Sequence, residues 1–326
     1  MVRRAEVLST LAGHILPNWN TCAASVPYAT PKIGYYNEDF HALRKNGIRP
    51  ARKDAMNGPW AYVNLGLYVL SFLCYARYLY GNNQWVGRLG TVFLAAGVLA
   101  QYVALLERSR WTHTVPYDDL YGSMSLFAWL LGVTYLGLEV YHGQRSVGAF
   151  VTLLLIIWTA LVMAFAPKAV PAAPPARGPL FALHVTLNTL AYAAFGLSFV
   201  LSVIYLVQNH VLKARKPGLT FWRFPALDVL EGMSRSSVFV GLLSLAVGMS
   251  FGFVWQHRLS GRFSAADPKI IVTLAIFALY IAYSWLAVQA GWRGARAARV
   301  CACNFLLVLF SYTIVNLYLT NFHRYL

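Results

Sequence analysis

Long apolar blocks, separated by short charged or proline-containing segments, dominate this sequence from about residue 58 onwards. Several blocks exceed the roughly 18 residues that an α-helix needs to cross a lipid bilayer. Their apolar residues run continuously instead of recurring on one helical face, which is typical of membrane spans. Only 12% of the 326 residues are charged, about half the share found in soluble domains. The sequence therefore predicts an all-α, polytopic transmembrane helix bundle.

The limits of the apolar blocks predict about eight spans. Charged, proline or glycine residues bound them at about residues 60–80, 88–106, 124–141, 147–166, 180–208, 237–256, 270–289 and 299–320. The Pro- and Ala-rich stretch Ala166–Pro179 is too broken by proline to be helical. We therefore expect an extramembrane extension over residues 1–57, a first group of four helices over 58–166 and a second group over 167–326. No sequence repeat relates the two groups, so an inverted-repeat transporter gains no support.

Basic residues lie almost wholly between the apolar blocks, and they give the chain a formal net charge of +16. Loops that face anionic lipid headgroups explain this distribution more simply than a nucleic-acid partner does, so we expect membrane lipid and no nucleic acid. The basic tail favours an internal N-terminus and the basic loops favour an external one; we follow the loops. The charged residues Arg77 and Glu139 lie near span ends, where they are expected to snorkel towards water.

Four cysteines occur in the chain, at Cys22, Cys74, Cys301 and Cys303. None of them forms a Cys-x-x-Cys pair or a Cys-x-x-Cys-His attachment site. The chain is therefore not expected to carry covalently attached haem.

Several histidines are predicted to share one membrane face. His184 opens the fifth predicted helix, His257 follows the sixth and His323 closes the eighth. Because eight spans alternate in direction, all three lie on the same side, together with His113. Two neutral histidines from facing helices can supply both axial nitrogens of a haem iron. The alternative is that each is an interfacial polar residue, and composition alone leaves both interpretations open.

Five short motifs follow one another in order along the second half of the chain. They are His184–Phe195, Gly248-Met-Ser-Phe-Gly-Phe-Val-Trp255, Asp267-Pro-Lys, Gly291-Trp-Arg-Gly and Phe322-His-Arg-Tyr325, and Asp119–Ser123 adds a weaker one upstream. Together they resemble the CcsA/ResC-type cytochrome c assembly proteins over roughly residues 116–326. Single matches would mean little, but their shared order is hard to obtain by chance.

The resemblance implies a haem site at the outer membrane surface. It implies His184 and His323 as axial ligands of the iron, with Trp255, Asp267 and Tyr325 contacting the cofactor. It also implies a non-covalent haem b that is presented to a synthetase partner and apocytochrome c, as part of a cytochrome c haem lyase or synthetase. The location expected on this basis is the bacterial inner membrane.

Two departures from the family pattern leave two hypotheses open. The three loop tryptophans of the family fall here at Ser260, Ser264 and Ala266, and its intramembrane histidine aligns at or near Trp285. Each absent indole loses a stacking surface, worth about 1 kcal/mol beyond burial. The chain is then either a divergent assembly factor that still delivers haem, or a relative recruited as a haem-binding or structural membrane subunit of an electron-transfer complex.

Overall fold

The computed structural model describes residues 58–81, 83–112, 120–164, 178–214, 225–260 and 268–314. These residues form eight α-helices and one 3-10 helix, and no strand occurs among them. The elements are α4 (Pro59–Gly81), α5 (Gln84–Thr112), α6 (Leu120–His142), α7 (Gly148–Ala164), α8 (Gly178–Lys213), α9 (Leu227–Ser260), α10 (Pro268–Val288), η3 (Ala290–Trp292) and α11 (Ala295–Ile314). The predicted all-α architecture is confirmed. The extension 1–57, His113, Asp267, His323 and Tyr325 lie outside the described residues.

Five of the described helices, α5, α6, α8, α9 and α10, are long and apolar enough to cross a membrane. Helix α7 is apolar but has only 17 residues. Helices α4 and α11 pack against the longer helices without meeting the same criteria of length and composition. The protein is therefore a polytopic helical membrane protein, and the predicted eight helices include five that qualify as spans by these measures.

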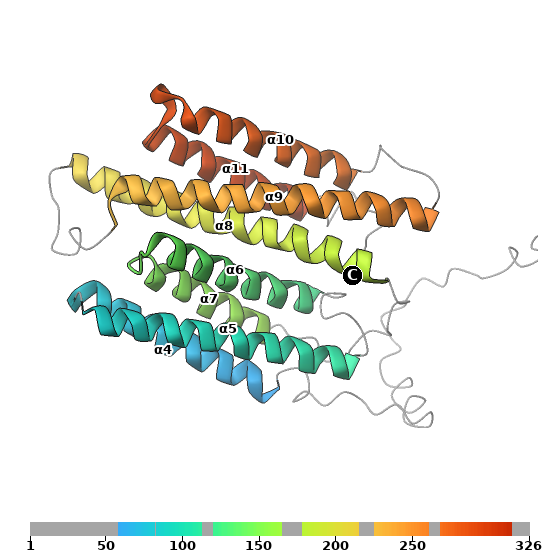
Figure 1. The fold of residues 1–326 in the computed structure, drawn as a ribbon, viewed down its shortest axis with the longest axis horizontal. Coiled ribbons are helices and arrows are strands. Elements are labelled where there is room, and N and C mark those ends of the chain that lie inside the picture. Colours follow the sequence, from blue (N-terminus) through green and yellow to red (C-terminus); the bar gives the residue numbers. More distant parts are fainter. Residues whose placement is uncertain are drawn as a thin grey trace, which may run out of the picture. The chain divides into compact units, whose positions relative to one another are not determined.

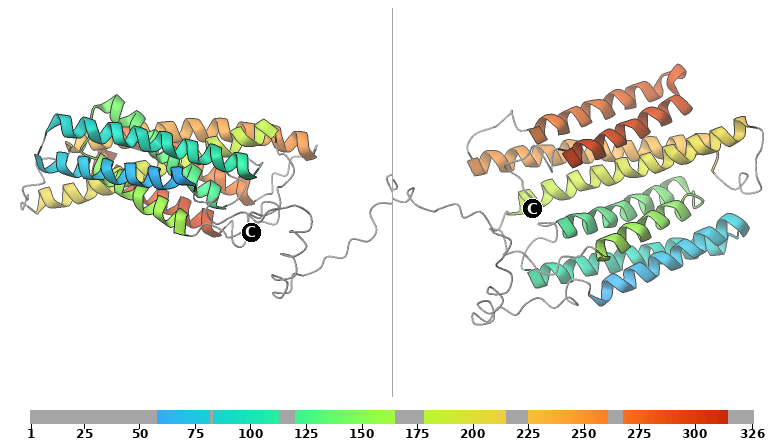
Figure 2. Two further views of the ribbon diagram at one scale, coloured as in Figure 1. Left: turned by 90° about the horizontal axis from the view of Figure 1, so that it is seen from below. Right: turned by 180° about the vertical axis from the view of Figure 1, so that it is seen from behind.

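The helix axes run roughly parallel, with α4 to α7 in one group and α8 to α11 in another (Figure 1). Helices α8 and α9 form the most extensive pair, and α8 also packs against α6 and α11 (Figure 2). Consecutive helices run in opposite directions, so α8 begins where α9 ends. We call the end at which α4, α6, α8 and α10 begin the His184 end, and the opposite end the Glu139 end.

Glycine notches receive buried tyrosines in the first group. Tyr68 and Tyr75 of α4 are fully buried. A Cβ added at Gly97 of α5 would lie 2.7 Å from the Tyr68 ring, and one added at Gly148 would lie 2.8 Å from the Tyr75 ring. Small residues at helix crossings let the backbones approach, as membrane helix packing requires.

An aromatic stack joins three helices of the second group. The Phe195 ring of α8 stacks on Tyr280 of α10, with 3.7 Å between ring centroids and 6° between planes. Gly241 of α9 also lies against Phe195, where an added Cβ would collide with the ring. Ser237 of α9 donates a 2.7 Å hydrogen bond to the Ala194 carbonyl of α8. These contacts hold α8 close to α9 and α10.

Glu139 of α6 does not snorkel, so that prediction was wrong. Its side chain is only 2% exposed. The Tyr75 hydroxyl donates a 2.6 Å hydrogen bond to one carboxylate oxygen, and the Thr91 hydroxyl donates to the other. Arg145 Nε lies 3.5 Å from that second oxygen. A buried carboxylate needs such partners because desolvation otherwise disfavours its charge. Arg77 is exposed on α4, and its snorkelling stays a prediction.

Candidate functional site

His184 lies near the start of α8 and is partly buried against the last turns of α9. Its Nδ1 atom is 2.8 Å from the carbonyl oxygen of Gly248 on α9. A carbonyl oxygen only accepts, so Nδ1 carries the proton and the lone pair is on Nε2. Histidines that bind metals commonly have their second nitrogen fixed in this way. The donor chemistry of His184 therefore fits a haem-iron ligand through Nε2.

Asn188, one helical turn beyond His184 on α8, restrains the same imidazole. Its Nδ2 atom lies 3.0 Å from Nδ1 and 3.4 Å from Nε2 of His184. An atom that close to both ring nitrogens at once lies over the face of the ring, because the in-plane position would collide with Cε1. Asn188 Oδ1 is buried and has no hydrogen-bond partner in the described part of the chain. The amide thus fixes the tilt of the imidazole and leaves a spare acceptor beside it.

The glycines of α9 make room for both polar side chains. A Cβ added at Gly252 would collide with the His184 ring, because it would lie 2.5 Å from Cε1 of that ring and 3.3 Å from its Cγ. A Cβ added at Gly248 would lie 2.9 Å from Asn188 Oδ1 and 3.1 Å from Leu187 Cβ. The four-residue spacing places both glycines on one face of α9. The motif Gly248–Trp255 is therefore the surface that receives the start of α8.

Trp255 continues this contact towards the helix end. Its ring packs against Phe181 of α8, with 4.9 Å between centroids and 47° between planes. The indole is partly buried among the hydrophobic residues of the bundle. Trp255 thus holds α8 against α9 beside His184, and its contact with a cofactor stays a prediction.

Of the remaining candidate site residues, some lie among the described residues and others do not. His257 lies at the exposed end of α9, two residues beyond Trp255. Asp267, His323 and Tyr325 are outside the described residues, as are the side chains at Ser260, Ser264 and Ala266. The structure therefore brings His184 and Trp255 to one end of the α8/α9 pair, and the pairing of His184 with His323 stays a prediction.

Trp285, which aligns at or near the family's intramembrane histidine, lies on α10 with 65% of its surface exposed. Because the side chain faces away from the other helices, this position does not line the interior of the bundle. A second haem within the bilayer would find no ligand at this residue.

Sequence reasoning missed the atoms that orient His184. Asn188 could have been found, because its four-residue spacing from His184 puts both on one face of a helix. The Gly248 carbonyl carries no such signal, since every residue has a carbonyl group and only the helix pairing selects this one.

Known proteins with sequences similar to this chain include members of one family and three individual relatives. Residues 117–323 match the family described as cytochrome C assembly protein. The cytochrome c biogenesis protein CcsA of Synechococcus sp. (strain CC9311) is 26% identical over 296 residues, covering 81% of this chain and 97% of that protein. CcsA of Mesostigma viride is 24% identical over 297 residues, with 81% and 95% covered. Protein HemX of Brevibacillus brevis is 27% identical over 258 residues, with 78% and 94% covered.

Proposed function

Since the chain belongs to the cytochrome c assembly protein family, we propose that it binds haem b non-covalently at the His184 end and presents it for attachment to apocytochrome c. The iron would be held between Nε2 of His184 and the imidazole of His323. The observation that carries this proposal is the 2.8 Å contact between His184 Nδ1 and the Gly248 carbonyl, which leaves Nε2 as the unprotonated nitrogen.

The residues around His184 have separate roles in this proposal. The Gly248 carbonyl and the Asn188 amide fix the tautomer and tilt of the ring. Gly252 keeps the space that the imidazole occupies, and Trp255 locks the ends of α8 and α9 together through Phe181. Bound haem would supply the vinyl groups to which the thiols of an apocytochrome are joined. Because the His184 imidazole is already held in place before haem binds, less conformational entropy is lost when it binds the iron.

The protein partners and location follow from the same family membership and are proposals too. A haem synthetase component and an apocytochrome c would meet the protein at the His184 end, where His257 is exposed beside the partly buried His184. Two full-length relatives bear the name cytochrome c biogenesis protein. We place the protein in the cytoplasmic membrane of a bacterium, with the His184 end on the outer side.

Haem content and cytochrome assembly test the proposal together. Purified protein should give a b-type pyridine haemochrome, and His184→Ala or His323→Ala should remove most of it. His210→Ala is the matched control, because His210 lies exposed on the opposite end of the same helix α8. Cells without the gene should fail to make holocytochrome c, and the two ligand variants should not restore it. Normal holocytochrome c in the deletion strain would reject the delivery role.

The loss of the three loop tryptophans favours a second candidate function, a haem-binding or structural subunit of an electron-transfer complex. In that case the protein should co-purify stably with redox proteins, and cytochrome c should mature normally without it. The deletion strain thus separates the two functions, since only the first requires the protein for maturation.

A further inference from the structure

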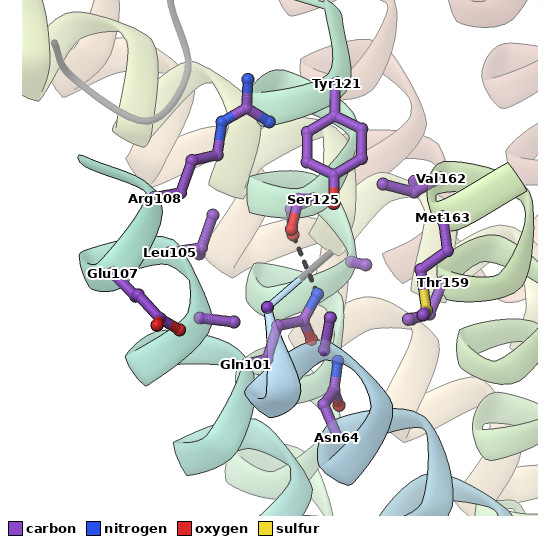
Figure 3. A pocket seen from close by; sticks show the side chains of 14 residues that line it. Asn64, Gln101, Leu105, Glu107, Arg108, Tyr121, Ser125, Thr159, Val162 and Met163 are labelled. Atoms are coloured by element: carbon purple, nitrogen blue, oxygen red, sulfur yellow. Dashed lines mark hydrogen bonds between the residues drawn. The ribbon is translucent and has the colours of Figure 1, made fainter. Parts of the chain in front are cut away.

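A polar cavity opens among the first four helices at the His184 end, apart from the α8/α9 site. Each of α4, α5, α6 and α7 contributes to its wall, and Figure 3 shows their side chains converging on one space. The polar lining residues are Asn64, Gln101, Glu107, Arg108, Tyr121, Ser125 and Thr159. Such a concentration of polar groups between membrane helices needs hydrogen-bond partners.

Gln101, at the centre of the cavity wall, already uses both ends of its amide. Its Oε1 accepts a 2.6 Å hydrogen bond from the Tyr68 hydroxyl. Its Nε2 donates to the Ser125 carbonyl at 3.0 Å (Figure 3). Gln101 therefore joins α4, α5 and α6, and both polar atoms of its amide have a partner.

Two other side chains in the wall have buried polar atoms without a partner in the described part of the chain. Asn64 Oδ1 belongs to a residue that is 2% exposed, and Thr159 Oγ1 to one that is 5% exposed. Thr159 is unusual for its helix, because Thr152 of α7 bonds back to the Gly148 carbonyl at 2.7 Å. An unpaired buried polar atom costs about 1–3 kcal/mol, so we expect both atoms to bind a group that the described residues do not supply.

The size of the cavity limits what that ligand can be. It offers about 30 Å³ to water-sized molecules, and by this measure one water needs roughly 10–15 Å³. Glu107 and Arg108 both line it, so their opposite formal charges do not select an ion of either sign. Water can donate to the Asn64 carbonyl and either donate to or accept from the Thr159 hydroxyl.

We propose that this cavity is a hydration site in which two or three ordered water molecules bridge Asn64 Oδ1 and Thr159 Oγ1. These waters complete the hydrogen bonding of Asn64 Oδ1 on α4 and Thr159 Oγ1 on α7, which have no partner among the described residues. They also bring water into the first group of helices from the His184 end. The site does not depend on haem binding, so it stands or fails separately from the proposed function.

Radiolytic hydroxyl-radical footprinting tests the proposal on the purified full-length protein. Met163 lines the cavity and is partly buried, and Met249 of α9 is partly buried away from the cavity. Bound water should make Met163 oxidise several-fold faster than Met249. Oxidation of Met163 should fall several-fold in the double variant Asn64→Leu/Thr159→Val, and it should not change in Thr152→Val. Equal oxidation of the two methionines in the unmodified protein, or no fall in the double variant, overturns the proposal.

A second measurement is whether Asn64→Leu raises or lowers the Tm of the protein. If Asn64 Oδ1 is hydrated, Asn64→Leu removes its hydrogen bonds and lowers Tm by roughly 2–4 °C. If the cavity is dry, the same change removes an unpaired buried carbonyl and raises Tm. A rise in Tm therefore contradicts the hydration site. Footprinting of the unmodified protein keeps the proposal testable should the variant not fold.

Discussion

The imidazole of His184 on α8 lies directly over Gly252 on α9, so closely that a side chain on Gly252 would occupy the same space as the ring. This contact joins the two helices that pack most extensively in the second group. The position of the His184 ring therefore depends on Gly252, which is 68 residues away in the sequence, having no Cβ. The position of the His184 ring and the packing of α8 on α9 are therefore one structural feature.

Gly252→Ala should displace His184 and loosen α8 from α9. Overpacking of this kind costs about 1–3 kcal/mol, and haem content should fall with the tilt of the ring. Gly66→Ala is the control, since an added Cβ there meets no atom within 4 Å and Gly66 is exposed on α4. That control should gain about 0.5–1 kcal/mol from helix propensity. Unchanged Tm and haem content in Gly252→Ala would contradict the close contact.

Asn188→Leu should change the orientation of the His184 ring and leave the packing of α8 on α9 intact. The change keeps the side-chain size but removes the amide that lies 3.0 Å from His184 Nδ1. We expect the haem absorption bands to shift or broaden, because the imidazole of the proposed ligand can then tilt about its remaining hydrogen bond to the Gly248 carbonyl. Protein yield and helicity should stay near those of the unmodified protein. An unaltered haem spectrum would show that Asn188 does not orient the ligand.

Helix boundaries show what the sequence could predict and why part of it was missed. All eight helices were expected near their observed places, because the apolar blocks mark most of their length. Helix α9 begins at Leu227, ten residues before the predicted start at residue 237. Asp228, Glu231 and Arg235 interrupt the apolar run but not the helix. Glu231 is held by a tertiary contact, a 3.2 Å hydrogen bond from the Gly294 amide, which no local pattern reveals.

Glu139 illustrates the same limit for buried charge. The sequence shows an acidic residue near the end of α6, and snorkelling is the usual outcome there. Its actual partners come from three other segments, through Tyr75, Thr91 and Arg145. For His184 the reverse holds, because its place at the start of α8 was predicted and only the partner atoms on α9 were not.

Tyr75→Phe should destabilise the first group of helices. It removes the 2.6 Å hydrogen bond to Glu139 and leaves a buried carboxylate oxygen without that donor. Loss of a hydrogen bond to a charged group costs about 1.5–3 kcal/mol. Tyr62→Phe is the matched control on the same helix, since Tyr62 is exposed. Thermal unfolding in detergent measures the difference, and equal Tm values for the two variants would refute the role of the Tyr75 hydroxyl.

Restoring the missing indoles should tighten haem binding. The triple variant Ser260→Trp/Ser264→Trp/Ala266→Trp returns the three tryptophans of the family loop, each worth about 1 kcal/mol of stacking. Haem should then transfer more slowly to an excess of apomyoglobin. A control with leucine at the same three positions separates aromatic stacking from simple hydrophobicity. Equal transfer rates for the tryptophan and leucine variants would mean that the loop does not contact the porphyrin.

Chemical rescue at His184 tests the central claim most directly. His184→Gly removes the proposed ligand and opens a space beside Gly252, into which free imidazole can diffuse. We predict that the reduced, purified protein shows a six-coordinate b-type spectrum, that His184→Gly loses it, and that added imidazole restores it. The same variant at His210 should keep its spectrum without imidazole. If His184→Gly retains the original spectrum, or imidazole has no effect after the spectrum is lost, His184 is not the iron ligand.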